Sequence, residues 1–247
     1  MSGVDLGMRP MTRSQRGVLH LGLLLWVMAG EARGVDSAVE PSGEVSACGS
    51  TATMVARIQK RYDGIRDLSA RFEQVSHTVV LGGAAALEPA ASQGEVVLAK
   101  PGRMRWSYLE PEPSFVISDG RVVWIYDVGG RQVTRVRVDR DYLAGAALQF
   151  LLGQGQLAEA FAIEETGCED GQIQLALLPR EPAGYERLWL TAETTTGLVT
   201  ATSIVDLFGN QTSLRFMNIE VNQSPEPSIF EFSLPEGVEL LEVDTGP

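Results

Sequence analysis

From residue 68 onward, apolar and polar residues alternate in short runs that are separated by turn-forming pairs. The first run spaces Leu68, Ala70 and Phe72 two residues apart, with polar residues between them. Side chains that alternate in this way lie on opposite faces of a β-strand. The pairs at 119–120 and 209–210 are Asp-Gly and Gly-Asn, which favour the tight turns of antiparallel hairpins. The pattern therefore predicts a long antiparallel meander that forms a barrel or a strongly curved sheet.

The other expected strands show the same period and are bounded by turn residues. They cover residues 94–100, 103–108, 115–117, 122–126, 132–138, 173–177, 188–191, 199–208, 212–221 and 230–234. Residues 82–93 are mostly small and show no period, which is typical of a loop between two strands. The fold class is therefore expected to be mainly β with a minor α component.

Two stretches follow the helical period instead. Ser50 or Thr51 can cap a helix whose apolar residues, as far as Ile65, recur at helical spacing. A second helical stretch covers 141–152 and is followed by a glycine, which favours a helix end there. A shorter helical piece is expected at 157–161. The helices thus precede the meander and interrupt it midway.

The beginning of the chain has the features of a secretion signal. Three arginines precede the apolar run at 18–29, and small residues follow it as far as Gly34. This order is typical of a signal peptide, and we expect cleavage near Ala32. The apolar run is shorter than the roughly 20 residues that a membrane-spanning helix needs. We therefore expect residues 1–32 to be removed and the remainder to be exported.

The two cysteines of the chain, Cys48 and Cys168, both lie in the exported portion. In an oxidising compartment such a pair favours a disulfide over a metal site. A loop of about 120 residues closed by this bond would stabilise the fold by roughly 4–5 kcal/mol. Two buried free thiols are the alternative. Cys48 also ends the run Val-Ser-Ala-Cys, which resembles a lipoprotein cleavage box, so lipidation of Cys48 is a further alternative.

The residues needed for most kinds of chemistry are missing from the sequence. The formal net charge is −12, which argues against binding nucleic acid because that function needs a basic surface. His77 is the one histidine after residue 32, and no Gly-x-Ser-x-Gly motif accompanies it. No cluster of histidines, cysteines and carboxylates has the spacing of metal ligands. We therefore expect no catalytic residue, no metal and no cofactor.

Large apolar side chains are frequent on the expected strands and in the second helical stretch. Two interpretations fit this composition. The helices either pack permanently on the sheet as part of an ordinary core, or cover an apolar pocket that opens for a ligand. Composition alone does not separate these two cases.

Six segments, in order along the chain, resemble the outer-membrane lipoprotein carrier proteins. They are 68–74 (LSARFEQ), 94–108 (GEVVLAKPGRMRWSY), 118–127 (SDGRVVWIYD), 150–157 (FLLGQGQL), 207–211 (LFGNQ) and 230–238 (FEFSLPEGV). The resemblance implies an unclosed β-barrel of about eleven strands covered by lid helices. It implies a hydrophobic cavity for lipoprotein acyl chains, an inner-membrane ABC transporter that supplies the cargo, and an outer-membrane receptor that accepts it. It also implies a periplasmic location, and we expect a monomer.

The resemblance also implies roles for single residues. Lys100 takes the place of a basic residue, often arginine in the family, that hydrogen-bonds the backbone of the lid helices and holds the lid closed. Lysine lacks the planar fork of arginine, so its grip on the lid is expected to differ. The residues that we expect to line the cavity and its lid are Ile58, Phe72, Trp106, Tyr108, Trp124, Leu148, Leu151 and Leu152.

The expected organisation is a signal peptide at 1–32, a flexible lead-in at 33–50, the carrier domain at 51–242 and a tail at 243–247. Three other functions stay open at this point. The chain could carry another lipid or a glycolipid on the same fold. It could be a membrane-anchored receptor of the same architecture, which requires a lipidated Cys48. An exported hydrolase that uses His77 is the least favoured.

Overall fold

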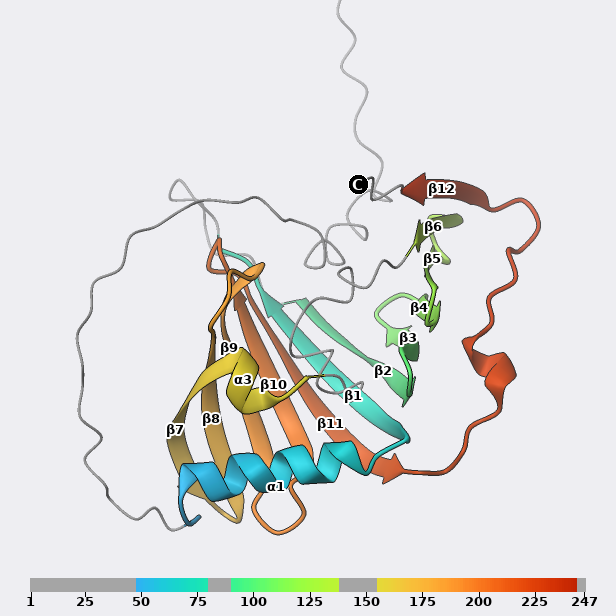
Figure 1. The fold of residues 1–247 in the computed structure, drawn as a ribbon. Helices are drawn as coiled ribbons and strands as arrows, with labels where there is room; N and C mark the ends of the chain where they lie inside the picture. The colour runs from blue at the N-terminus through green and yellow to red at the C-terminus, as the bar shows by residue number, and fades with distance from the viewer. Residues whose placement is uncertain (1–47, 80–89, 138–154, 244–247) are drawn as a thin grey trace, which may run out of the picture.

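The computed structural model describes residues 48–79, 90–137 and 155–243 of the chain (Figure 1). The expected signal peptide, the helical stretch at 141–152 and most of the expected loop at 82–93 lie outside these ranges. The fold can therefore be compared with the sequence expectations for the sheet, for the first helix and for the segments that join them.

One twelve-stranded sheet forms the body of the molecule, and it does not close into a barrel. Its order is β12-β6-β5-β4-β3-β2-β1-β11-β10-β9-β8-β7. All neighbours are antiparallel except β12, which runs parallel to β6. The strands are β1 (Asp67–His77), β2 (Ala90–Ala99), β3 (Arg103–Glu110), β4 (Ser114–Asp119), β5 (Val122–Asp127), β6 (Gln132–Arg137), β7 (Phe161–Glu169), β8 (Gln172–Pro179), β9 (Tyr185–Glu193), β10 (Val199–Asp206), β11 (Gln211–Val221) and β12 (Glu239–Val243).

The helices lie on one side of this curved sheet, which we call the inner face (Figure 1). Helix α1 (Thr51–Asp63) crosses the strands of the β7–β11 half, and α3 (Leu157–Ala160) leads directly into β7. The Ser50 hydroxyl caps α1 by accepting a hydrogen bond of 3.2 Å from the Thr53 amide. The expected open, strongly curved sheet with helices against it is confirmed.

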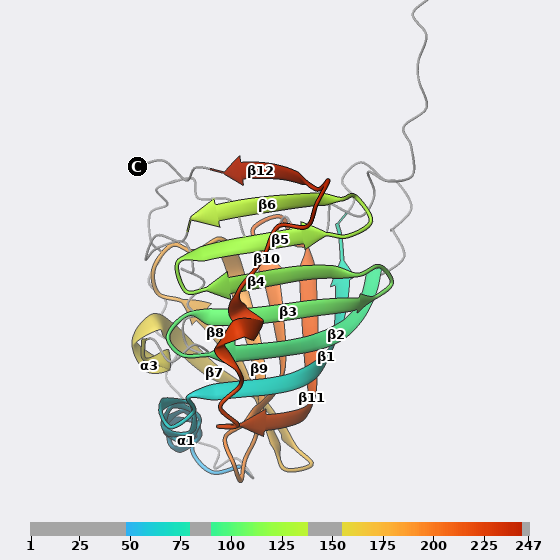
Figure 2. The same cartoon turned by 90° about the vertical axis from the view of Figure 1, so that its right-hand side faces the viewer.

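The alternation of the sequence fixes which side chains point inward. In β1, Leu68, Ala70 and Phe72 are buried, as expected from their spacing. They join α1 and the opposite strands in one core, which lies between the helix and the inner face. The outer face of β3–β6 is crossed by the C-terminal strap, residues 224–238, which contains the 3-10 helix η4 (Pro227–Phe230) (Figure 2).

Four expectations about strands were wrong. Residues 230–234 form no strand, because the Phe230 side chain is buried under Arg103 and holds the strap across the strands. Strand β7 was not expected, because a bulge between Glu165 and Gly167 breaks its alternation. Strand β12 was not expected either, because two leucines stand next to each other in it. Residues 90–93 belong to β2 instead of a loop, and pair with β1.

Candidate functional site

An aromatic cluster lies at the centre of the inner face. The β1–β2–β3 and β1–β11 registers bring Phe72, Trp106, Tyr108 and Phe216 together from three strands. The ring centroid of Phe72 lies 5.0 Å from Trp106 and 5.1 Å from Tyr108, both edge to face. Phe216 lies 6.4 Å from Trp106. Phe72 is fully buried and the other three rings are partly buried, so the cluster runs from the core toward an accessible apolar surface.

A glycine makes room for this cluster. Gly94 faces Phe72 across the β1–β2 pair and Tyr108 across the β2–β3 pair. A Cβ atom at Gly94 would lie 2.0 Å from the Ser107 carbonyl oxygen and 3.0 Å from the Phe72 ring. No side chain fits there without a shift of the backbone. Gly94 therefore lets the Phe72 ring lie directly against the sheet.

A short chain of hydrogen-bonded polar groups borders the aromatic cluster on one side. The Tyr108 hydroxyl donates a hydrogen bond of 3.1 Å to Gln74 Oε1, and Gln74 Nε2 donates one of 3.4 Å to the Ser76 hydroxyl. Burial raises the pKa of Tyr108 to about 12, so its hydroxyl stays neutral at physiological pH. These bonds satisfy buried polar groups among aromatic rings, where an unpaired group would be costly.

Helix α1 fills the space in front of the β7–β11 half of the inner face. Met54, Ile58 and Tyr62 are almost completely buried, as is expected for the sheet-facing side of an amphipathic helix. The Tyr62 hydroxyl accepts a hydrogen bond of 3.2 Å from the Val199 amide, and burial raises the pKa of Tyr62 to about 12. Ile58, expected as a cavity residue, is thus part of the packed helix interface.

Lys100 contacts the carboxyl end of α1. It follows β2 directly, and its Nζ atom donates a hydrogen bond to the backbone oxygen of Tyr62. Desolvation by burial lowers the pKa of Lys100, and the nearby Asp63 carboxylate partly offsets this effect. The expected contact between Lys100 and the backbone of a covering helix is therefore present in the structure.

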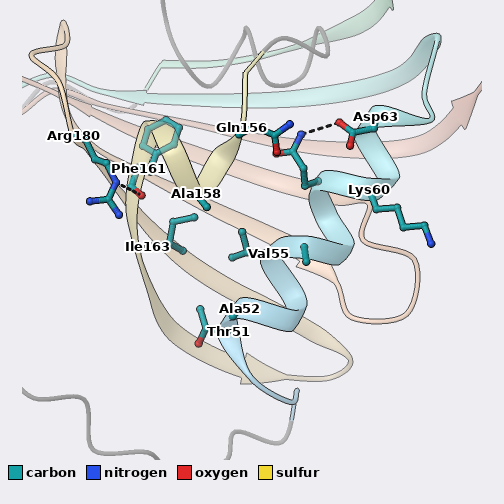
Figure 3. Close-up of a pocket in the computed structure, with 12 residues that line it drawn as sticks. Thr51, Ala52, Val55, Lys60, Asp63, Gln156, Ala158, Phe161, Ile163 and Arg180 are labelled. Carbon is teal, nitrogen blue, oxygen red and sulfur yellow. Dashed lines mark hydrogen bonds between the residues drawn. The ribbon is translucent and has the colours of Figure 1, made fainter.

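A groove opens between α1, α3 and β7 (Figure 3). Its volume is about 630 Å³, within the range of about 300–1,000 Å³ that is usual for small-molecule sites. Both apolar and polar side chains line it. The lining residues are Thr51, Ala52, Val55, Ala56, Gln59, Lys60, Asp63, Gln156, Ala158, Phe161, Ile163 and Arg180. Sequence reasoning missed this groove, because it is formed by the surface of α1 that does not face the sheet.

The two helices that form the groove are joined by the Gln59 side chain. Its Oε1 atom accepts a hydrogen bond of 3.0 Å from the Leu157 amide, at the start of α3. Its Nε2 atom donates to the Gly155 carbonyl oxygen at 3.4 Å and to Asp63 Oδ1 at 2.8 Å. One amide group thus connects α1 to the backbone on both sides of Gln156.

A disulfide connects the residues before α1 to the edge strand β7. Cys48 and Cys168 are bonded, with their Cα atoms 5.9 Å apart and a sequence separation of 120. The expected disulfide is confirmed. The bond engages the Cys48 thiol, which is the group that the lipidated-receptor alternative would need.

The structure does not place Trp124 on the inner face, so its expected role in the cavity is corrected. Val123 and Ile125 belong to the core, and Trp124 between them points to the outer face. There its ring stacks on Phe232 of the C-terminal strap at 5.3 Å. Its strand neighbours are all apolar, so no alternation indicates which face each one occupies. Leu148, Leu151 and Leu152, the other expected lid residues, lie outside the described residues.

Neither a metal-binding cluster nor a membrane-spanning helix occurs in the described ranges. Among the described residues, no group of three or more histidines, cysteines and carboxylates could hold a metal ion. His77 lies at the exposed end of β1, paired in register with Gln211. Within the same ranges, no helix has both the length and the apolar character needed to cross a membrane.

Comparison with known proteins gives consistent matches. The family model of the outer membrane lipoprotein carrier protein LolA matches residues 63–233. An outer-membrane lipoprotein carrier protein of Alkalilimnicola ehrlichii is 36% identical over 77% of this chain and 85% of its own length. One of Methylococcus capsulatus is 32% identical over 77% of this chain and 88% of its own. The crystal structure of an uncharacterized conserved protein from Thermus thermophilus covers 78% of this chain and 98% of that one, with a TM-score of 0.49 and 11% identity. That last likeness is too weak to carry an argument.

Proposed function

The chain belongs to the outer membrane lipoprotein carrier protein family, and on that premise we propose that it carries lipoproteins by holding their acyl chains against its inner face. The observation that carries this proposal is the inner aromatic cluster of Phe72, Trp106, Tyr108 and Phe216. It runs from the buried core to partly exposed rings, so a ligand can extend an apolar surface that the fold already contains.

The physical need for such a carrier follows from the cargo. Each buried CH₂ group of a lipid chain is worth about 0.8 kcal/mol, so transfer of several acyl chains through water without a carrier would be very slow. Apolar contacts are not directional, which suits the binding of flexible chains and their later release. The proposed function requires no bond to be formed or broken in the cargo, and it requires no cofactor.

The finer steps belong to the same proposal. The mature chain acts in the periplasm after cleavage near Ala32. It accepts lipoproteins from an inner-membrane ABC transporter and delivers them to an outer-membrane receptor, as a monomer. Lys100 holds the covering helix α1 against the sheet through its hydrogen bond to the Tyr62 backbone oxygen. The groove between α1, α3 and β7 gives the first acyl chain a point of entry, because its walls are already apolar.

The test is a release assay on spheroplasts that contain an active lipoprotein transporter. Purified mature protein is added, and the supernatant is examined for lipoproteins that co-purify with it. We expect release that depends on the added protein. If a known carrier releases lipoproteins and this protein does not, the lipoprotein proposal is wrong, and lipids that co-purify with the protein would then identify another cargo, such as a glycolipid.

Two variants in β3 show whether the inner face carries the activity. Trp106→Glu places a charge among the inner rings, and Leu109→Glu places the same charge at a residue of the same strand that is 51% exposed. We expect loss of release for Trp106→Glu and normal release for Leu109→Glu. Circular dichroism establishes that both variants are folded. Leu214→Glu, on the inner face of β11, replaces Trp106→Glu if that variant is unfolded.

A further inference from the structure

Helix α1 is fixed to the sheet at both ends. Its amino end is tied to β7 by the Cys48–Cys168 disulfide. At its carboxyl end, Lys100 donates to the Tyr62 backbone oxygen, and the Arg66 amide donates a hydrogen bond of 2.7 Å to Asn222 Oδ1. Along its length, the Arg57 guanidinium donates to the Thr194 carbonyl oxygen. Displacement of α1 would strain the disulfide tether and break contacts with three other parts of the sheet.

The β9–β10 turn adds a close contact to this attachment. Gly197 has a φ of +72°, and a Cβ atom on it would lie 3.1 Å from the Arg57 carbonyl oxygen and 3.3 Å from the Ile58 Cα. The turn therefore lies directly against the backbone of α1. A helix that is packed this closely, and that buries Ile58 completely, is part of the permanent core.

The α3 segment is attached much more weakly. It is a single turn, Leu157–Ala160, whose main apolar anchor is Leu157. Among the hydrogen bonds formed by side chains within the described ranges, those joining α1 to residues 155–160 all come from Gln59. At its other end the segment continues into β7, where Arg180 donates to the carbonyl oxygens of Ala160 and Phe161. Within the described ranges, the segment is thus held by its junction with β7, by the buried Leu157 side chain and by the Gln59 amide.

We propose that the acyl-chain site opens by movement of the 155–160 segment away from a stationary α1, and that Gln59 is the positioning residue that controls this opening. This inference rests on the proposed function and deepens it. The groove of about 630 Å³ already separates the two elements, so an entering chain widens an existing gap. The disulfide fixes α1 on one side of the groove. The hydrogen bonds of Gln59 determine how readily the 155–160 segment moves away on the other side.

The experiment is amide hydrogen exchange on the mature, disulfide-bonded protein, with and without a synthetic triacylated lipopeptide. We expect the lipopeptide to accelerate exchange in residues 155–160, where the Leu157 amide is protected by Gln59, and to leave α1 protected. Faster exchange in α1 and in 155–160 together would show that the helices move as one unit, which contradicts the inference. Unchanged exchange in 155–160, with the lipopeptide bound, would contradict it as well.

Two variants test the role of Gln59. Gln59→Ala removes both contacts with the segment, and we expect the lipopeptide to associate about five- to tenfold faster. Gln223→Ala is the matched control, since Gln223 is an exposed glutamine whose side chain donates one hydrogen bond to the Val221 carbonyl oxygen and does not line the groove. Its association rate should equal that of the unmodified chain. Equal rates for Gln59→Ala and the unmodified chain would show that Gln59 has no positioning role.

Removal of the disulfide tests whether this bond keeps α1 stationary. In Cys48→Ser/Cys168→Ser, we expect the lipopeptide to accelerate exchange at the amino end of α1 as well as in 155–160. Persistent protection of that end would show that the disulfide does not fix the helix. Gel filtration of the lipopeptide with the unmodified protein separates the two proposals. Failure to co-elute contradicts the proposed carrier function itself, and the inference then fails with it.

Discussion

Aromatic side chains lie in opposite settings on the inner face of the sheet and on the outer face of β3–β6. On the inner face, Phe72, Trp106, Tyr108 and Phe216 contact one another, and in the part of the chain that the structure describes no guanidinium lies over these rings. On the outer face, three rings each pair with an arginine. The guanidinium carbon lies 5.2 Å from the ring centroid for Arg103 and Phe230, 5.3 Å for Arg105 and Phe115, and 5.1 Å for Arg135 and Trp124.

The outer arginines also hold the C-terminal strap by its backbone. Arg105 donates a hydrogen bond of 3.0 Å to the Ile229 carbonyl oxygen, and Arg131 donates one of 3.1 Å to the Gly237 carbonyl oxygen. Directional bonds and cation–π contacts specify one partner in one position. Within the described ranges, the inner rings have only one such bond, from Tyr108 to Gln74. The outer cover is thus held by directional contacts, whereas the inner rings meet one another mainly through non-directional apolar contacts.

Among the changes that distinguish the inner helix α1 from the outer strap, removal of the disulfide should lower the free energy of unfolding most. For a loop of 120 residues, we expect Cys48→Ser/Cys168→Ser to lower the free energy of unfolding by about 4–5 kcal/mol, measured by urea denaturation. Because the bond attaches α1 and not the strap, amide exchange without ligand should rise in α1 and stay constant in η4. An equal rise in η4 would mean that the two covers form one cooperative unit.

Replacement of a buried phenylalanine on either face should give the second-largest loss of stability. Phe72 and Phe230 are both 1% exposed, and each substitution by alanine should cost about 3–5 kcal/mol in urea denaturation. Phe72→Ala should also weaken lipopeptide binding, measured by a fluorescence titration under conditions where both variants are folded. Weaker binding by Phe230→Ala, to the same degree, would show that the outer face takes part in cargo binding.

The buried tyrosines of the inner side predict a loss of stability at alkaline pH. Burial raises the pKa of Tyr62 and of Tyr108 from 10.0 to about 12, so the unfolded chain loses these protons first. The stabilisation that these two groups contribute should be fully present below pH 10 and be lost between pH 10 and 12, by up to about 2–3 kcal/mol for each group. Tyr108→Phe should reduce that fall, measured by urea denaturation across this range. An unchanged fall in the variant would assign the effect to other groups.

The Lys100 contact should have a smaller effect. Lys100→Met removes the hydrogen bond to the Tyr62 backbone oxygen but keeps the apolar stem, and we expect a loss of about 1 kcal/mol in thermal unfolding. Arg121→Met, which removes an exposed cation from a turn at the same end of the sheet, should stay within about 0.5 kcal/mol. Similar values for both variants would show that Lys100 does not stabilise the helix.

The smallest effect is expected at the rim of the outer face. Arg135 and Glu242 form an ion pair of 2.8 Å with side chains that are 31% and 63% exposed. Glu242→Gln should cost about 0.2–1 kcal/mol in urea denaturation, and less in high salt. Arg135→Met should cost more, because it also removes the contact with the Trp124 ring. Equal costs would mean that the cation–π contact adds nothing to the outer cover.

The sequence predicted the sheet best where apolar and polar residues alternate strictly. Leu68, Ala70 and Phe72 show the period of two, and all three face inward. Where the period is hidden, prediction failed. Trp124 stands in an apolar strand, so neither face was indicated, and only its contact with Phe232 shows that it points outward. The bulge in β7 likewise removed the alternation that would have identified that strand.

The candidate site was predictable only in part. Alternation and family resemblance identified Phe72, Trp106 and Tyr108, because their positions within single strands decide their direction. The groove and the role of Gln59 could not be predicted, because they depend on contacts between segments about one hundred residues apart. The side-chain amide of Gln59 bonds to backbone groups of Gly155 and Leu157. Because almost every residue type has these backbone groups, the sequence at 155 and 157 does not indicate the contact.

A sheet that does not close into a barrel leaves two edge strands, here β12 and β7. Unpaired edge strands can add further strands from other molecules and so begin aggregation. Both edges of this sheet carry acidic residues, at Glu239 and Glu242 in β12 and at Glu164, Glu165 and Glu169 in β7. Two copies that approach edge to edge therefore bring like charges together. The acidic edge strands thus disfavour pairing between copies of this unclosed sheet.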